Sequence, residues 1–313
     1  MLRPLFIHLS HAPWARQFIT RFVFARRAAS RFIAGETPED AIRVIRGLNA
    51  KGISASVDHL GENVLSESDA TRAADDYLTI LDQICASGVK SHASVKLTQL
   101  GLDLGESVCL NNMRRILSRA RDCGTFVRVD MEGSDYTERT LTVVRTLKHD
   151  YGFDNVGAVI QSYLYRSEKD VRELAEEGVR VRLCKGAYSE PPDRAFPKKK
   201  DVDGNYVKLT RILLEAVSAK PANGNGLYPA IATHDEKMIR AAKSYAVEKK
   251  APREAFEFQM LHGIRRDLQE SLVREGYNVR VYVPYGSEWY PYVMRRLAER
   301  PANLWFILSN IFR

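Results

Sequence analysis

The chain has 313 residues, 45% of them hydrophobic and 27% charged, which excludes a disordered protein and indicates a globular one with a sizeable core. The four cysteines, Cys85, Cys109, Cys123 and Cys184, form no CxxC pair, so the sequence indicates neither a disulfide framework nor a zinc site. The formal net charge of +8 raises the question of a nucleic-acid or membrane partner.

Much of the positive charge lies at the N-terminus. Residues 1–35 contain six arginines and no acidic residue, with aromatic side chains interleaved, which is typical of a basic amphipathic helix. We expect a helical arm over residues 1–50 that either covers one end of the fold or makes peripheral contact with the inner face of the cell membrane. No helix-turn-helix, RNP or zinc-finger pattern accompanies the charge, so we expect no nucleic-acid partner. No signal-peptide core and no apolar run near the roughly 20 residues of a membrane span is found, which favours a cytoplasmic protein.

From residue 53 onward, short β-branched runs alternate with longer stretches of helical periodicity, such as 69–87, 111–123, 136–151, 167–177 and 206–217. The eight predicted strands are 53–57, 92–97, 126–131, 156–161, 179–184, 228–233, 256–261 and 279–283. Strands separated by helices pair in parallel, and eight such units close most naturally into a barrel. We therefore predict a single (β/α)8 barrel domain over residues 51–313, preceded by the helical arm. A doubly wound open sheet is the alternative.

One predicted connection is unusually long. After the fifth strand, residues 189–205 contain Pro191, Pro192, Pro197 and the run Lys198–Lys200. A βα loop of this length is more often functional than idle, so we expect it to contribute to a site.

Polar side chains stand at the carboxyl end of nearly every predicted strand, which is the end where barrels of this kind form active sites. In chain order they are Asp58 and Glu62, Lys96, Asp130 and Glu132, Gln161, Arg182 and Lys185, Thr233 and His234, Gln259 and His262, and Tyr282. A rim salt bridge would explain any single one. Lys96, Asp130 and Arg182, however, lie inside apolar runs, where an unpaired charge costs several kcal/mol. The set therefore predicts an enzyme.

The segment after the last strand adds a second polar group. Tyr292, Arg295, Arg296 and Glu299 follow i, i+3, i+4, i+7 spacing and so share one helix face. Two adjacent arginines beside a tyrosine offer a forked anchor for a small carboxylate. A solvated polar stripe is the alternative interpretation.

Several chemistries are disfavoured. The sequence has no HxH or HExxH, no GxSxG and no GxGxxG, so metal catalysis, a serine nucleophile and a Rossmann site are not indicated. A Schiff-base lyase using Lys96 or Lys185 stays open. The string RLCKGAY, residues 182–188, places cations and a glycine at a strand-to-loop junction, which suits the pyrophosphate of a cofactor.

These strings resemble the proline dehydrogenase (proline oxidase) family. In family order they are VDHLGE (57–62), SVKLTQLG (94–101), VRVDME (127–132), VIQSYLYR (159–166), RLCKGAY, YPAIATHDE (228–236), FEFQMLHGI (256–264), YVPYG (282–286) and YVMRRLAERPAN (292–303). The resemblance runs from about residue 31 to 306. RLxKGAY, ATH and YxxRRLxE are its most specific parts. Because no aldehyde dehydrogenase module is found, the chain looks like the monofunctional form.

The resemblance implies a flavoenzyme that holds FAD at the open end of the barrel. Such an enzyme oxidises L-proline to Δ1-pyrroline-5-carboxylate and passes the electrons to a membrane quinone. The cofactor-binding positions that match are Gln161, Arg182, Lys185, Gly186, Ala187, Thr233, His234, Gln259, Arg296 and Glu299. Arg182 is the catalytic residue expected near the flavin N5, where a cation favours reduced flavin.

The resemblance also implies a substrate site. Lys96, Arg295 and Arg296 would hold the proline carboxylate, and Glu62 would pair with Arg295 as a gate. Asp130, Tyr188, Leu261, Tyr282 and Tyr292 would enclose the ring, with Lys96 and Asp130 counted among the catalytic residues. Members specific for hydroxyproline carry a smaller residue at position 292, so Tyr292 favours proline and leaves a hydroxyproline-oxidising enzyme as the alternative. Ser189 departs from the family, which often has tryptophan there.

Overall fold

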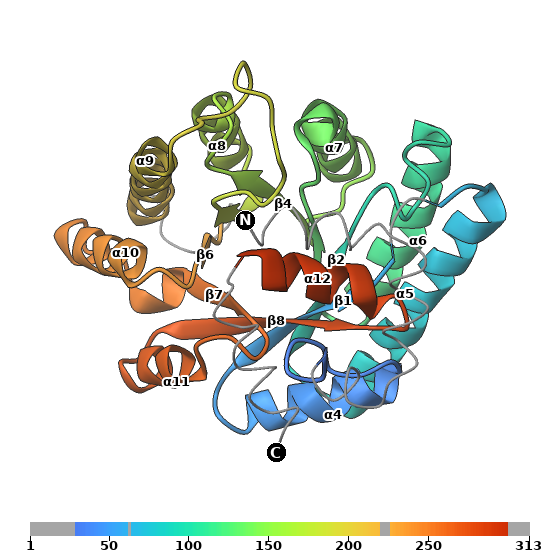
Figure 1. Cartoon of the computed structure of the whole chain (residues 1–313). Coiled ribbons are helices and arrows are strands. Elements are labelled where there is room, and N and C mark those ends of the chain that lie inside the picture. The colour runs from blue at the N-terminus through green and yellow to red at the C-terminus, as the bar shows by residue number, and fades with distance from the viewer. Residues whose placement is uncertain (1–28, 62–63, 220–225, 300–313) are drawn as a thin grey trace.

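The computed structural model describes residues 29–61, 64–219 and 226–299, apart from the side chains of residue 295 and residues 297–299. Within these ranges eight parallel strands form a closed barrel in which each strand pairs with the next and β8 pairs with β1 (Figure 1). The strands are β1 (Ser54–His59), β2 (Ser91–Val95), β3 (Val127–Val129), β4 (Val156–Gln161), β5 (Arg180–Cys184), β6 (Ala230–Ala232), β7 (Glu257–Leu261) and β8 (Asn278–Tyr285).

Helices surround the barrel wall (Figure 1). They are α4 (Pro38–Asn49), α5 (Glu67–Ser87), α6 (Glu106–Asp122), α7 (Thr137–Arg145) with a π-helical extension (Thr146–Asp150), α8 (Ser167–Glu176), α9 (Lys199–Ala219), α10 (Glu236–Glu248) and α11 (Arg266–Arg274). The last helix, α12 (Trp289–Glu299), is not part of this ring. Two 3-10 turns lie at Ser134–Tyr136 and Arg253–Ala255. Because helices cover the outer face and side chains fill the interior, all six residues of β4 are buried.

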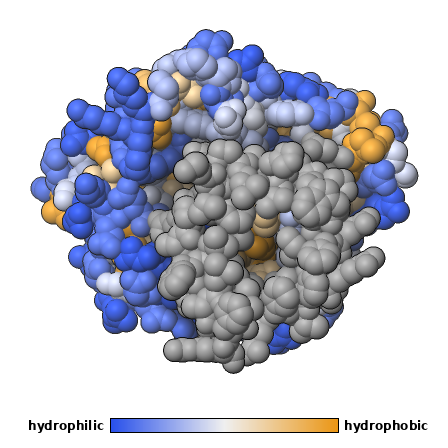
Figure 2. Space-filling model, viewed as in Figure 1, coloured by the Kyte–Doolittle hydropathy of each residue, from blue (hydrophilic) through white to orange (hydrophobic). Residues whose placement is uncertain are grey.

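The helix α12 determines how the mouth of the barrel is shaped. It follows β8 and crosses in front of the strands in Figure 1, so it lies over their carboxyl ends. The residues that it buries are Trp289, Tyr290, Tyr292, Val293 and Met294, packed with Phe32, Ile33, Leu60 and Ile264. Leu261, the last residue of β7, packs against this cluster. Around this end the helices present a largely hydrophilic rim (Figure 2).

The predicted (β/α)8 barrel is confirmed. A strand forms in each of the eight predicted places, and the open-sheet alternative is wrong because β8 pairs with β1 over six residues. The predicted arm is described only from residue 29. Its helix α4 packs against β1 and β8, on the side of the barrel. No helix in the described ranges has the length and apolar character needed to cross a membrane.

The predicted loop over 189–205 is wrong in its second half. The helix α9 begins at Lys199, directly after the last proline of the loop and Lys198. Asp203 accepts hydrogen bonds from Lys199, four residues earlier, and from Lys185 at the end of β5. These contacts of Asp203 stabilise the first turn of α9, so two of the three consecutive lysines belong to a helix.

Candidate active site

A buried arginine lies at the centre of the candidate site. Arg182 of β5 is 5% exposed, and its Nη1 donates to Asp130 Oδ1 at 2.6 Å. Its Nη2 donates to the hydroxyls of Ser56 and Ser94, at 3.1 and 3.0 Å, and these two hydroxyls lie 2.8 Å apart. The Nε atom is buried and has no hydrogen-bond partner among the described residues. The guanidinium is therefore fixed in position, and its buried Nε–H is still to be satisfied.

Asp130 connects this arginine to the wall of the mouth. Its second oxygen accepts a hydrogen bond from Tyr282 Oη at 2.8 Å, and the Tyr282 ring lies 5.3 Å from the Arg182 guanidinium carbon. Burial and the carboxylates of Asp130 and Asp58 raise the pKa of Tyr282 well above its usual value, so the phenol stays neutral. The three side chains form one connected group, with Asp130 directly after β3 and with Arg182 and Tyr282 within β5 and β8.

A second cation, largely buried, lies beside this group. Lys96 Nζ donates to both oxygens of Asp58, at 3.0 and 3.1 Å. Burial opposes the charge on Lys96, but the Asp58 and Asp130 carboxylates outweigh it and raise the pKa of Lys96, which stays an ammonium. Burial also raises the pKa of Asp58, against the attraction of Lys96. Because both carboxylate oxygens accept from the ammonium, we treat the two as an ion pair.

The junction after β5 is held by two further carboxylates. Lys185 Nζ lies 2.5 Å from Asp203 Oδ1 on α9 and 2.9 Å from Asp235 Oδ2, the residue that caps α10. Burial opposes ionisation of both acids, but their hydrogen bonds with Lys185 lower the pKa of each. Gly186 follows with φ +106°, and a Cβ there would lie 2.6 Å from the Tyr163 ring. No residue larger than glycine fits at this turn.

Gln161 presents an unsatisfied acceptor at the end of β4. Its Nε2 donates to the Glu132 carbonyl at 3.2 Å, whereas its buried Oε1 has no partner in the described part of the chain. The Glu132 carboxylate accepts hydrogen bonds from the backbone N–H and the hydroxyl of Thr98. An acceptor on Gln161 and a donor on Arg182 thus remain to be satisfied from the barrel interior.

The predicted residues that follow β6 or lie on β7 form hydrogen bonds with the backbone or with a side chain nearer the amino-terminal end of the barrel. His234 Nε2 accepts from the Leu261 N–H at 2.9 Å, a partner that the sequence did not indicate. The Thr233 hydroxyl accepts from the Asp235 N–H at 3.1 Å. Gln259 Nε2 donates to Glu257 Oε1 at 2.5 Å, which turns its amide toward the opposite end of the barrel.

The remaining predicted residues lie at the rim. Tyr188 is 43% exposed, and its phenol is close enough to contribute to the raised pKa of Lys96. Ala187 beside it is exposed. Tyr292 is buried on α12, with the Arg296 guanidinium 5.3 Å from its ring. Glu62 and the side chains of Arg295 and Glu299 lie outside the described residues, so the gate and part of the predicted anchor stay predictions.

Sequence reasoning missed four residues that position the cations. Ser56 and Ser94 precede Asp58 and Lys96 by two positions, and a period of two along a strand could have placed them on the same inward face. Asp203 lies in a segment interpreted as loop. Asp235 follows the predicted Thr233 and His234, but no local pattern links it to Lys185.

The family model described as Proline dehydrogenase matches residues 41–308. The chain belongs to the proline dehydrogenase family. It is 40% identical to Proline dehydrogenase 1 of Bacillus subtilis (strain 168) over the full length of both chains. It is 42% identical to Proline dehydrogenase of Deinococcus radiodurans, over 91% of this chain and 90% of that one.

Among solved structures, the fold is similar to that of proline utilization A (PutA) from Bdellovibrio bacteriovorus inactivated by N-propargylglycine. The TM-score is 0.81 and the identity 28%, over 91% of this chain and 34% of that chain. The chain therefore spans about a third of this PutA. The resemblance to the proline dehydrogenase family is confirmed, and the full-length match to the Bacillus relative supports the monofunctional form.

The buried ion pair predicts a large effect on stability. Asp58→Asn leaves the Lys96 ammonium without its partner, so we expect the free energy of unfolding to fall by about 3 kcal/mol. The matched control is Asp103→Asn, which breaks a half-exposed pair with Arg139 and should cost less than about 1 kcal/mol. Urea denaturation of both variants measures the difference. Equal losses would show that Asp58 does not hold a buried charge.

Proposed function

We propose that this protein oxidises L-proline to Δ1-pyrroline-5-carboxylate with FAD bound at the barrel mouth, and that a membrane quinone receives the electrons. Two cations in a chain of this family support the proposal: Lys96, which directly follows β2 and is largely buried, and Arg182, which is buried within β5. An anionic substrate and an electron-rich reduced cofactor are both favoured by such cations.

Lys96 is suited to hold the proline carboxylate. An ammonium has three N–H donors, and two of its contacts here go to Asp58. A donor therefore remains for a substrate, and the raised pKa keeps the group charged. Arg295 and Arg296 belong to α12, the helix that lies over the mouth, and are the proposed partners of Lys96 in this anchor.

The mouth fits a flavin because it leaves both an acceptor and a donor to be satisfied. Gln161 Oε1 and Arg182 Nε are buried and have no partner among the described residues, and the edge of a flavin ring carries groups of both kinds. When bound, FAD would supply a two-electron acceptor for the C–N bond of proline. The residues proposed to hold it are Gln161, Arg182, Lys185, Gly186, Ala187, Thr233, His234, Gln259, Arg296 and Glu299, of which Gln259 would have to turn its amide away from Glu257.

Asp130 is proposed to orient its neighbours. One of its oxygens accepts a hydrogen bond from Arg182 and the other from Tyr282. Asp130 therefore sets the position of the guanidinium and of the Tyr282 side chain that would enclose the substrate ring. A strong base at carbon is not needed, because the lone pair of the neutral amine drives formation of the imine. What the chain must supply is rigid placement of the substrate at near-attack distance. Asp130, Tyr188, Leu261, Tyr282 and Tyr292 would enclose the ring.

Two other functions are less well supported. A Schiff-base lyase needs a neutral amine, whereas Lys96 has a raised pKa and Lys185 lies between two carboxylates. A hydroxyproline-oxidising enzyme would need room beside the substrate ring. Tyr292 is buried at the mouth, in the packed cluster of α12, and favours unsubstituted proline. Peripheral contact of the basic N-terminal arm with the inner face of the membrane is proposed as the route to the quinone.

L-Proline should change the visible spectrum of the purified protein. We expect the FAD-loaded protein to be yellow and L-proline to bleach its flavin absorbance under anaerobic conditions, because proline would reduce the bound flavin. Glycine, an amino acid without the ring, serves as the control and should leave the spectrum unchanged. A colourless protein that FAD does not reconstitute would refute the proposal.

Removing the Lys96 ammonium should weaken the proposed carboxylate anchor. Lys96→Met removes a charged hydrogen bond worth about 1.5–3 kcal/mol, so kcat/KM for proline should fall by roughly 10- to 100-fold. The Asp58 carboxyl, whose pKa burial raises, can take up a proton once its partner is gone. Lys169→Met, on the exposed face of α8, is the matched control and should keep full activity. The FAD content of both variants should equal that of the parent protein, and unchanged kcat/KM in Lys96→Met would exclude the anchor.

A further inference from the structure

The opposite end of the barrel contains a pocket that the proposed function does not use. It has a volume of about 550 Å³ and lies where strands begin, since Ser54 starts β1, Ser91 starts β2 and Arg180 starts β5. Four of its 13 lining residues are lysine or arginine, and one is acidic, Asp154. Asp154 is almost fully exposed and pairs with Lys148, so it does not offset the charge inside.

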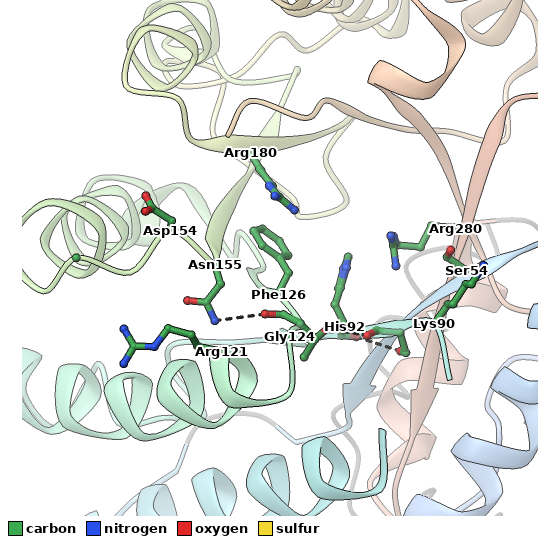
Figure 3. A pocket seen from close by; sticks show the side chains of 13 residues that line it. Ser54, Lys90, His92, Arg121, Gly124, Phe126, Asp154, Asn155, Arg180 and Arg280 are labelled. Atoms are coloured by element: carbon green, nitrogen blue, oxygen red, sulfur yellow. Dashed lines mark hydrogen bonds between the residues drawn. The ribbon is translucent and has the colours of Figure 1, made fainter. Parts of the chain in front are cut away.

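Two buried polar atoms at this end have no partner in the described part of the chain. His92 is 5% exposed and lines the pocket, and its Nε2 makes no hydrogen bond. Figure 3 shows His92, Phe126, Arg180 and Arg280 pointing toward the same space. Behind them Arg128 is 1% exposed, and its Nε is also without a partner. Buried polar atoms of this kind are rarely left unsatisfied.

The positive charge around this space exceeds the negative charge. Arg128, Arg180 and Arg280 lie here, and among the described residues the carboxylate that pairs with them is Glu257, which lies 2.9 Å from Arg280. Arg128 Nη1 donates instead to the backbone carbonyls of Ala158 and Arg180. The guanidinium carbons of Arg128 and Arg180 lie 4.8 and 4.9 Å from the Phe126 ring centroid.

The titration of His92 reflects this excess. Burial, followed by the charges of Arg280, Arg128, Arg182 and Arg180, lowers the pKa of His92 well below its usual value. Burial and neighbouring arginines likewise lower the pKa of Arg128. Both groups therefore experience a positive potential that a bound anion would relieve.

We infer that this pocket, at the amino-terminal end of the strands and called the floor pocket below, binds the phosphate group of a small soluble molecule. Lys90, Arg121 and Arg180 supply the charge, whereas Arg280 is already paired with Glu257, and His92 supplies a buried Nε2 that has no competing partner among the described residues. Arginine is the side chain best matched to phosphate oxygens. The pocket lies within the usual range for small-molecule sites, about 300–1,000 Å³, and is larger than a lone phosphate needs, which points to a phosphorylated compound.

The experiment titrates the FAD-loaded protein with inorganic phosphate and with pyrophosphate at constant ionic strength, by isothermal calorimetry. Bound FAD occupies the proposed pyrophosphate site at the mouth, and the loss of heat in variants of the pocket residues assigns the remaining binding to this end of the barrel. We expect saturable binding. The double variant Lys90→Gln/Arg121→Gln should weaken it by at least about 10-fold, because two charged contacts are lost.

The matched control is Arg43→Gln/Arg240→Gln, which removes two exposed arginines from outer helices and should leave affinity within about 2-fold. His92→Phe should weaken binding without lowering the melting temperature of the free protein, because Nε2 has no partner to lose. An absence of saturable binding to either anion up to about 10 mM would overturn the inference, since a Kd of about 1 mM would by then be saturated. Equal weakening in the control variant would also overturn it.

Discussion

The geometry of the mouth depends on the burial of a guanidinium inside a closed barrel. Arg182 is 5% exposed, and the strand hydroxyls of Ser56 and Ser94 with the Asp130 carboxylate satisfy three of its contacts. A buried charge without such partners costs several kcal/mol. The partners come from β1, β2 and the end of β3, and only closure of the sheet brings them to β5. These hydrogen bonds offset the free-energy cost of burying the charge of Arg182, and they also fix the orientation of its guanidinium.

The fold and the inward-facing charges could be predicted from local patterns. The alternation of β-branched and helical segments was sufficient to predict the eight strands, and β4 has the predicted bounds. Lys96, Asp130 and Arg182 were identifiable because a charge within an apolar strand must be paired or used. Their pairing was not predictable, because it depends on the stagger between strands. Lys96 bonds to Asp58 on β1, whereas Asp130 bonds to Arg182 on β5.

Longer-range contacts set the features that the sequence did not indicate. The start of α9 depends on Asp203, which lies between Lys185 and Lys199. Lys185 also pairs with Asp235, which caps α10, so one ammonium contacts the first turns of two helices near the junction after β5. At the barrel floor, His92 and Arg128 precede Lys96 and Asp130 on the same strands. Their surroundings became apparent only from the three-dimensional arrangement.

We propose that cations fixed by carboxylates hold the acid group of a small ring at the mouth. A crystal structure of the FAD-loaded protein with a proline analogue that has oxygen in place of the ring nitrogen tests it most directly, since this ligand cannot form the imine. We predict its carboxylate within about 3 Å of Lys96 Nζ, with the Arg182–Asp130 pair intact. A carboxylate bound away from Lys96, or Lys96 turned toward bulk water, would contradict the account.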